Sequence, residues 1–321
     1  MPEKEKPPDF RGDLYYLISF SNALAFNMED ISYKCNFRVD KSKCIKCGKC
    51  QNVCSGQVIL YDENGYPYIK PFERFGWRGC WRCDHCLAVC PTGAISIFGK
   101  KPENSTLPPD ACIADEMEKL IKFRRSCRRY LHKNVDPATL DRILSCMESV
   151  PTGGNSMSVE YTVIDKVEVV DEIRRVAYQK MDELAKRGIY TSSFSDFYYS
   201  KMKASENTIR KGDLLFNGAP QLFIAHKRAT GKWAEDAKNE CIIADTYFEI
   251  IANAFGLGTV VMSYSAEVLN ELSPEAREIT GIPKDHCIPL IVGFGYPEIR
   301  YTRGVQKDRK KIIHRRSDTL L

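Results

Sequence analysis

Two cysteine runs with the same spacing constrain this chain more than any other feature. Each run reads Cys-x-x-Cys-x-x-Cys-x-x-x-Cys, and together they hold eight of the fourteen cysteines: Cys44, Cys47, Cys50, Cys54, Cys80, Cys83, Cys86 and Cys90. Zinc sites usually present two cysteine pairs separated by a longer loop, and a disulfide framework needs an oxidising compartment. Zinc and disulfides are therefore less favoured alternatives to iron–sulfur ligation.

The spacing of both runs resembles that of bacterial two-cluster ferredoxins, in which cysteine thiolates hold two [4Fe–4S] clusters. In that pattern three ligands of each cluster come from one run and the fourth comes from the other run. The resemblance assigns one ligand set to Cys44, Cys47, Cys50 and Cys90. It assigns the other to Cys54, Cys80, Cys83 and Cys86. We therefore expect two clusters that transfer electrons singly.

Composition limits the remaining possibilities. A length of 321 residues suits two domains, and a hydrophobic content of 43% is sufficient for a substantial core. The net charge of +5, from 47 basic and 42 acidic residues, does not require nucleic acid as a partner. No apolar run reaches the length of a membrane span, and no apolar segment follows a basic start. We expect a cytoplasmic protein without membrane or nucleic-acid partners.

Changes in composition along the chain indicate where the domains divide. We expect an N-terminal extension over residues 1–40, a two-cluster domain over 41–99 and a linker over 100–114, where Pro and polar residues concentrate. A second domain with a C-terminal arm occupies 115–321. Between the cysteine runs, the Asn64-Gly65 dipeptide predicts a hairpin turn.

Helical and strand periods mix in the second domain without a regular βαβ repeat, which favours an α+β fold. Asp136 and Pro137 predict a helix start. Longer helices are expected over 167–186 and 234–255, and strands over 159–164, 221–225, 259–262 and 288–294. We expect the helix 234–255 to bury Ile242, Ile243, Tyr247, Ile250 and Ile251. The four histidines outside the cysteine runs (His132, His226, His286 and His314) are interpreted as isolated structural or surface residues.

Four motifs of this domain resemble the nitroreductase family of FMN-dependent enzymes. They are the basic run 123–130, the loop 151–155, Gly256-Leu-Gly-Thr259 after the long helix, and the basic C-terminal segment. The resemblance spans roughly residues 115–310. Together with the first domain, the arrangement looks like the ferredoxin–nitroreductase fusions of anaerobes: a small ferredoxin-like domain followed by a nitroreductase-like α+β FMN domain.

The resemblance implies a role for each motif residue. Arg124 and Ser126 would hold the FMN phosphate with Arg303 and Lys307, and Arg125 would seat the ribityl region. Further FMN contacts would come from Arg128 near N1, from the loop residues Pro151, Thr152, Gly153 and Asn155 at the pyrimidine side, and from Met262 and Ser263 near N5. The family also implies a homodimer with FMN at the subunit interface. The aromatic stretch 190–199 fits a pocket lid or simple packing equally well.

These features predict an iron–sulfur flavoprotein oxidoreductase. Electrons from a donor such as reduced ferredoxin or NAD(P)H would pass through the two [4Fe–4S] clusters to FMN. A small nitroaromatic, quinone or enone acceptor would then receive them. The flavin N5 would perform the transfer without a catalytic side chain. Two alternatives are an NAD(P)H-dependent nitroreductase that uses the clusters as an outward relay, and a non-catalytic electron-transfer or redox-sensing flavoprotein.

Overall fold

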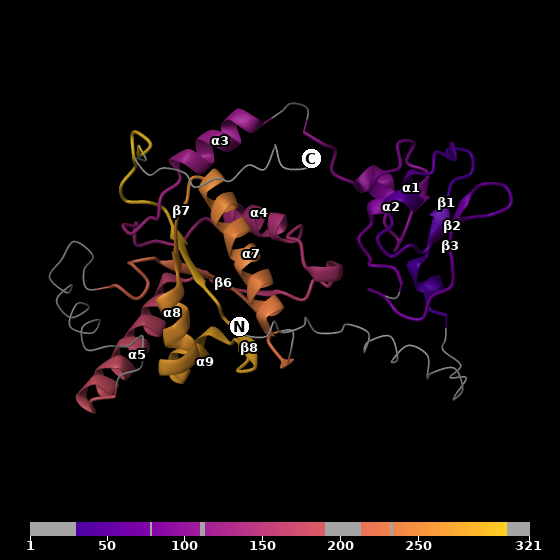
Figure 1. The fold of residues 1–321 in the computed structure, drawn as a ribbon. Helices are drawn as coiled ribbons and strands as arrows, with labels where there is room; N and C mark the ends of the chain where they lie inside the picture. The colour runs from indigo at the N-terminus through magenta and orange to yellow at the C-terminus, as the bar shows by residue number, and fades with distance from the viewer. Residues whose placement is uncertain (1–29, 78, 110–112, 190–212, 232–233, 307–321) are drawn as a thin grey trace, which may run out of the picture. The chain divides into compact units, whose positions relative to one another are not determined.

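The computed structural model describes residues 30–77, 79–109, 113–189, 213–231 and 234–306. Its contacts divide the chain into two compact units, Met1–Thr106 and Leu107–Leu321, whose elements are drawn in Figure 1. This division falls inside the predicted linker, while the predicted domain bounds themselves stay a prediction. No helix among the described residues is both long and apolar enough to span a membrane.

The first unit consists of short elements joined by loops. Two antiparallel pairs form its strands: β1 (Arg38–Val39) with β4 (Ile95–Ser96), and β2 (Ile59–Tyr61) with β3 (Pro67–Ile69). The helical turns are η2 (Ser32–Cys35), α1 (Lys49–Asn52), α2 (His85–Ala88) and η3 (Pro102–Asn104). Cysteines occupy much of its core, which includes Cys35, Cys50, Cys80 and Cys86. Cysteine side chains therefore occupy core positions that aliphatic side chains would fill in a larger domain.

The predicted hairpin turn connects β2 and β3. The amide of Gly65 donates to the carbonyl of Asp62 at 2.9 Å, and the Asp62 carboxylate accepts from the amides of Asn64 and Tyr66. Gly65 has a φ of +76°, a conformation that glycine adopts without a steric penalty. The Asn64-Gly65 prediction is confirmed.

The second unit is built on an antiparallel sheet. Its strands run in the order β5 (Glu160–Ile164), β6 (Gln221–Arg228), β9 (Ile291–Gly295) and β7 (Gly258–Met262). A short strand, β8 (His286–Cys287), also pairs with β6. The helices are α3 (Ala114–Phe123), α4 (Pro137–Met147), η4 (Gly153–Asn155), α5 (Val167–Lys186), α7 (Ala234–Ala254), α8 (Ser263–Glu267), the π-helix η7 (Val268–Leu272) and α9 (Pro274–Thr280).

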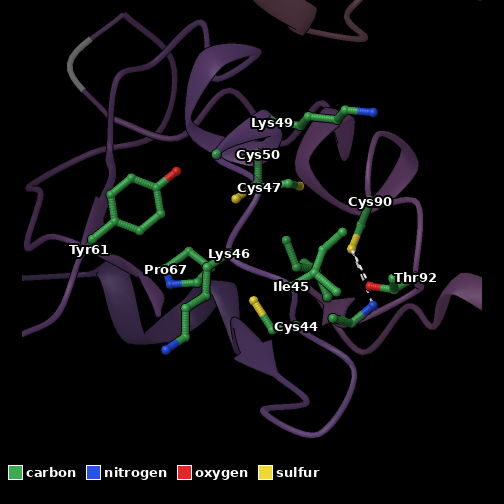
Figure 2. Close-up of a pocket in the computed structure, with 13 residues that line it drawn as sticks. Cys44, Ile45, Lys46, Cys47, Lys49, Cys50, Tyr61, Pro67, Cys90 and Thr92 are labelled. Carbon is green, nitrogen blue, oxygen red and sulfur yellow. Dashed lines mark hydrogen bonds between the residues drawn. The ribbon is translucent and has the colours of Figure 1, made fainter. Parts of the chain in front are cut away.

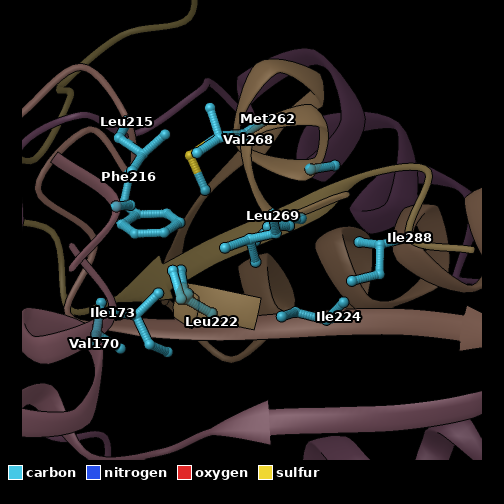
Figure 3. Packing of buried hydrophobic residues seen from close by; sticks show 14 of the residues in the cluster. Val170, Ile173, Leu215, Phe216, Leu222, Ile224, Met262, Val268, Leu269 and Ile288 are labelled. Atoms are coloured by element: carbon cyan, nitrogen blue, oxygen red, sulfur yellow. The ribbon is translucent and has the colours of Figure 1, made fainter. Parts of the chain in front are cut away.

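Alternating side chains of β6 place the sheet between two apolar cores. Leu222 and Ile224 join the core formed with α5, η7 and their neighbours (Figure 3). Phe223 and Ala225 face the opposite core, formed with α4 and α7. There the ring of Phe223 stacks on that of Phe248 with centroids 4.0 Å apart. The result is a mixed helix and sheet fold, as predicted.

The helix bounds agree well with the sequence, but one buried face does not. The helix α5 covers the predicted residues, and Asp136 caps α4 by accepting from the amide of Thr139 at 3.0 Å. For α7 the predicted buried side is wrong at three of five positions, because Ile242, Ile243 and Tyr247 are about two-fifths exposed. Ile250 is partly buried, and Ile251 is partly buried against the core. The buried residues of α7 are Ala237, Cys241, Ala244, Asp245, Phe248 and Ala252. These mostly small residues let the helix approach β6 closely.

The bounds of two strands differ from those predicted from the sequence. The strand β6 continues three residues beyond the predicted end, to Arg228, and the predicted strand 288–294 begins only at Ile291. The predicted aromatic stretch 190–199 lies outside the described residues.

Candidate functional site

The first cysteine run forms one side of a small cavity in the N-terminal unit (Figure 2). Cys44, Cys47 and Cys50 line this cavity with Cys90 of the second run. The amide of Ala94 donates to the Cys90 sulfur at 3.2 Å, which fixes the cross-run cysteine in place. An amide directed at a sulfur favours its thiolate form. The structure therefore brings together the first of the two predicted ligand sets.

A second cavity repeats this arrangement with the runs exchanged. Its lining includes Cys80, Cys83 and Cys86 of the second run and Cys54 of the first. A hydrogen bond with Cys35 lowers the pKa of Cys80 to about 7, while burial raises the pKa of Cys86 to about 12. The second predicted ligand set is thus also brought together.

The two runs share a backbone conformation as well as a spacing. Lys46 and Arg82, each two residues after the first cysteine of its run, both have a φ of +54°. Two residues further on, Gly48 and Asp84 have φ values of +79° and +57°. The left-handed region is unfavourable for residues other than glycine, by roughly 1–2 kcal/mol each. Both runs adopt this repeated geometry, which turns three sulfurs toward one point.

In the second unit, the basic run 123–130 lies against the start of β7. Ser126 forms a parallel bridge with Thr259, and the Cys127 amide donates to the Thr259 carbonyl at 2.7 Å. Gly258 leaves room for this contact, because a Cβ there would stand 2.6 Å from the Cys127 sulfur. The phenol of Tyr130 donates to the Cys127 carbonyl at 3.0 Å. These contacts hold the run in an extended conformation beside the sheet.

A polar network behind the run orients Arg124. Its guanidinium donates to the Glu249 carboxylate at 3.0 Å. The Thr259 hydroxyl donates to the same carboxylate oxygen at 3.3 Å and accepts from the Asn253 amide at 2.7 Å. Thr259 belongs to a motif singled out in the sequence, whereas Glu249 and Asn253 were not predicted from it. The available signal was the spacing of four residues between Glu249 and Asn253, which places both on one face of α7.

Arginines line a cavity of about 340 Å³ next to this network. Arg124, Arg125 and Arg300 contribute to its wall, together with the backbone segment Gly256–Gly258. Arg125 donates to the Val305 carbonyl at 3.4 Å, and its buried Nε lacks a hydrogen-bond partner among the described residues. Guanidinium groups match the geometry of phosphate oxygens. The chemistry of this cavity therefore fits a phosphate-bearing ligand.

The C-terminal segment returns to the same region. Gly304 lies close to the Lys122 carbonyl and Val305 accepts from Arg125, so Arg303 is positioned near the basic run and is exposed. Lys307 lies outside the described residues. Arg128 is exposed and contacts the Ser126 carbonyl at 3.5 Å.

The remaining predicted flavin contacts occupy two other places. Met262 is buried at the end of β7, and Ser263 is exposed at the start of α8. Pro151 and Thr152 lead into η4, where the Gly153 amide donates to Glu240 at 2.8 Å.

Within one chain, the loop 151–155 does not reach Arg124. The loop contacts α7 at Glu240, whereas Arg124 contacts the same helix at Glu249. At 1.5 Å per residue these positions are about 14 Å apart along the helix axis. A single subunit therefore keeps the Asn155 loop apart from the basic run.

Two histidines predicted to be isolated are in fact paired. The Nδ1 atoms of His226 and His286 are 2.9 Å apart, and the His226 Nε2 contacts the Thr162 hydroxyl at 2.9 Å. Potential ligand atoms of Glu160, His226 and His286 all lie within 4.8 Å of one another. Hydrogen bonds already occupy both ring nitrogens of His226, so the group is interpreted as a hydrogen-bond network rather than a metal site.

Comparison with known proteins identifies both units. Residues 121–296, more than half of the chain, match the family model described as the nitroreductase family. The chain belongs to the nitroreductase family. In addition to its nitroreductase domain, it matches the model of a 4Fe-4S dicluster domain over residues 43–94. The predictions of a nitroreductase domain and of a two-cluster iron–sulfur domain are therefore confirmed.

Curated relatives of this nitroreductase-family chain match its N-terminal unit. An uncharacterized ferredoxin of Methanocaldococcus jannaschii is 40% identical over 67 residues, which are 20% of this chain and 80% of that protein. A ferredoxin of Pyrobaculum islandicum is 40% identical over 58 residues, which are 18% of this chain and 49% of that protein. The chain thus spans about half the length of the second relative.

Solved structures of nitroreductases are similar to part of this chain. A Bacteroides fragilis nitroreductase with bound FMN is 20% identical, with a TM-score of 0.47 over 62% of this chain and 99% of that one. A Desulfitobacterium hafniense nitroreductase with bound FMN is 19% identical, with a TM-score of 0.48 over 62% of this chain and 98% of that one.

Proposed function

We propose that this protein is an iron–sulfur flavoprotein oxidoreductase that passes electrons through two [4Fe–4S] clusters to FMN and on to a small organic acceptor. The observation that carries the proposal is the grouping of eight cysteines into two sets of four, in a chain with a nitroreductase domain. A nitroaromatic, a quinone or an enone would serve as the acceptor. Reduced ferredoxin or NAD(P)H would be the donor, and a reducing cytoplasm suits the clusters.

Each cluster would be held by cysteines of both runs. Cys90 would complete the set of Cys44, Cys47 and Cys50, and Cys54 would complete the set of Cys80, Cys83 and Cys86. The two clusters supply one-electron transfer when bound. The domain that carries them would extend over residues 41–99, after an N-terminal extension over 1–40.

The flavin phosphate would bind at the arginine-lined cavity. Arg124, oriented by Glu249, and the guanidinium of Arg125, which lines the same cavity, would donate to the phosphate oxygens, and Ser126 would add a hydroxyl donor. Arg303 and Lys307 of the C-terminal arm would complete the phosphate site. Arg128, Met262 and Ser263 would contact the ring system. FMN exchanges one or two electrons at a time when bound, which links single-electron carriers to two-electron acceptors.

A homodimer would unite the two parts of the flavin site. Pro151, Thr152, Gly153 and Asn155 cannot reach the basic run of their own chain, so we propose that they serve the site of the partner subunit. An apolar face of α7 supports this assembly, because Ile242, Ile243 and Tyr247 are exposed on it. The helix α3 buries none of its residues and exposes Met117 and Ile121. Exposed apolar patches of this kind mark interaction surfaces.

The test begins with flavin absorbance under anaerobic conditions. Reduced ferredoxin, NADH and NADPH are added separately to the purified protein, and bleaching of the flavin identifies the donor. Bleaching by ferredoxin alone supports electron entry through the clusters. Bleaching by a nicotinamide alone would instead favour the clusters as an outward relay. A purified protein without any flavin signal would refute the FMN assignment.

Arg124→Ala tests the phosphate site. We expect this variant to lose FMN by at least tenfold in affinity, because it removes a charge-assisted donor, while its iron content stays unchanged. Arg175→Ala is the matched control, since Arg175 pairs with Glu172 on the exposed side of α5. Full flavin occupancy in Arg124→Ala would remove Arg124 from the site.

A further inference from the structure

We infer that the surface around the first cysteine cavity is the docking site for a small acidic ferredoxin that delivers electrons to this protein. The inference rests on the proposed function, which places a cluster in that cavity. Lys46 and Lys49 line this cavity, Lys41 and Lys43 precede them in the same segment, and all four are exposed. The segment 41–49 contains no acidic residue. Clustered charge of one sign raises the association rate of an oppositely charged partner.

One of the predicted cluster ligands is exposed at the surface among these four lysines, which we call the lysine patch. The structure describes all eight cysteines of the two runs, and of these only Cys47 is exposed. Lys46 precedes Cys47 directly, and Figure 2 shows the Lys46 and Lys49 side chains directed away from the sulfurs. Electron carriers exchange electrons at the exposed edge of a cluster. A partner attracted by these lysines would therefore arrive at the position where transfer is shortest.

The lysines are gathered although they repel one another. The ammonium groups of Lys41 and Lys46 lie 4.9 and 4.5 Å from the centroid of the same Tyr66 ring. Cation–π attraction at such distances amounts to roughly 0.5–1 kcal/mol at exposed sites. The nearest acidic group in sequence, Asp40, lies 3.7 Å from Lys43. Among the residues that the structure describes, Lys43 is the one of these four lysines that pairs with a carboxylate, so the other three are available to an anionic partner beside the cluster's own negative charge.

An apolar side chain occupies the middle of the patch. Ile45 is 63% exposed and lies between the first two cysteines of the run. Protein interfaces combine an apolar centre with a charged rim, and short-lived electron-transfer complexes use the smallest interfaces. The combination of Ile45, an exposed cluster ligand and a lysine rim fits a redox protein better than a nucleic acid.

The surroundings of the second cavity differ in charge. Arg82 stacks on the Phe75 ring with 3.9 Å between its guanidinium carbon and the centroid. Asp84 forms an ion pair with Lys100. Asp84 places a carboxylate at the wall of the second cavity, whereas the segment 41–49 contains none, so the second cavity offers a weaker attraction for an acidic partner. Electrons are therefore expected to enter at the first cavity.

Binding measurements test the docking site without relying on turnover. A purified acidic bacterial [4Fe–4S] ferredoxin, oxidised, is titrated into the cluster-loaded protein by calorimetry at low and at raised ionic strength. We expect affinity to fall with salt, and the double variant Lys41→Glu with Lys46→Glu to bind about tenfold more weakly or worse. Lys34→Glu is the matched control, because Lys34 is exposed in the same unit but belongs to η2. Its affinity should stay within twofold of the original.

Two further measurements keep the test decisive. If Lys46→Glu lowers the iron content, the pair Lys41→Gln and Lys43→Gln replaces it, with at least a threefold loss expected. Polyglutamate serves as a competitor. If polyglutamate binds as tightly as the ferredoxin, the inference is overturned in favour of a non-specific polyanion surface. Equal affinity of the lysine variants and the original protein would also overturn it. Normal ferredoxin binding without flavin bleaching would count against the proposed function, not against the docking site.

Discussion

The buried histidine pair should make the stability of the second unit depend on pH. His226 is 3% exposed. Burial, and then the nearby His286, lower its pKa from 6.5 to about 4, while Glu160 opposes and Arg277 adds to the change. At 1.36 kcal/mol per pH unit, this difference corresponds to about 3 kcal/mol in total. The folded protein therefore resists a proton that the unfolded chain accepts.

The sign follows from which state binds the proton. Above pH 6.5 neither state is protonated at His226, and its full contribution to stability is present. As the pH falls below 6.5 the unfolded chain takes up the proton first, so stability is lost until the folded pKa is reached. Between about pH 7.5 and about pH 5, the loss from His226 amounts to about 2 kcal/mol.

Comparison with a His226→Gln variant isolates this effect. Glutamine retains a hydrogen-bonding amide but does not titrate. The free energy of unfolding of the variant should therefore change by about 2 kcal/mol less than that of the original protein over the same pH range. Urea unfolding of both proteins at each pH, followed by circular dichroism in the helical region, provides the measurement. The clusters and the titrating groups distant from His226 are common to both proteins and cancel, so the measured difference reports His226 together with its neighbours His286 and Glu160. Parallel pH profiles would refute the assignment of a depressed pKa to His226.

Two further substitutions test the packing and the ligand sets. Gly258→Ala should lower the free energy of unfolding by about 1–3 kcal/mol, because the new Cβ would overlap the Cys127 sulfur. Thermal melting measures this change, and an unchanged melting curve would show that the basic run moves aside without cost. Cys90→Ala should damage the cluster held by Cys44, Cys47 and Cys50. Iron content and electron paramagnetic resonance of the reduced protein measure the loss. Selective loss of the other cluster would reverse the assignment.

The cysteine spacing predicted more of the structure than any periodicity did. The two runs have the same spacing, and their loops have the same backbone conformation, with left-handed residues at the equivalent positions Lys46 and Arg82. The bounds of α5 were also predictable, since its buried residues, such as Val170, Ile173, Ala177 and Met181, recur at a helical period. Local signals of this kind specify local structure without information from distant residues.

What the sequence could not predict depends on contacts between distant residues. The buried face of α7 was misassigned because bulky residues usually mark a core, whereas Ala244 and Ala252 allow closer approach to the sheet. The network of Arg124 with Glu249 joins residues 125 positions apart. The histidine pair exists only because β5, β6 and β8 are neighbours. No motif records any of these contacts.

The strand order has a consequence for synthesis on the ribosome. Among the described residues β9 is the last strand in sequence, and it lies between β6 and β7 and supplies hydrogen-bond partners to both. Until residues 291–295 emerge, β6 and β7 each present an unpaired edge, and such edges invite pairing with other chains. The N-terminal unit, by contrast, closes its contacts within the first 106 residues. The nascent chain can therefore acquire iron early, whereas the sheet of the larger unit cannot be completed until residues 291–295 have been synthesised.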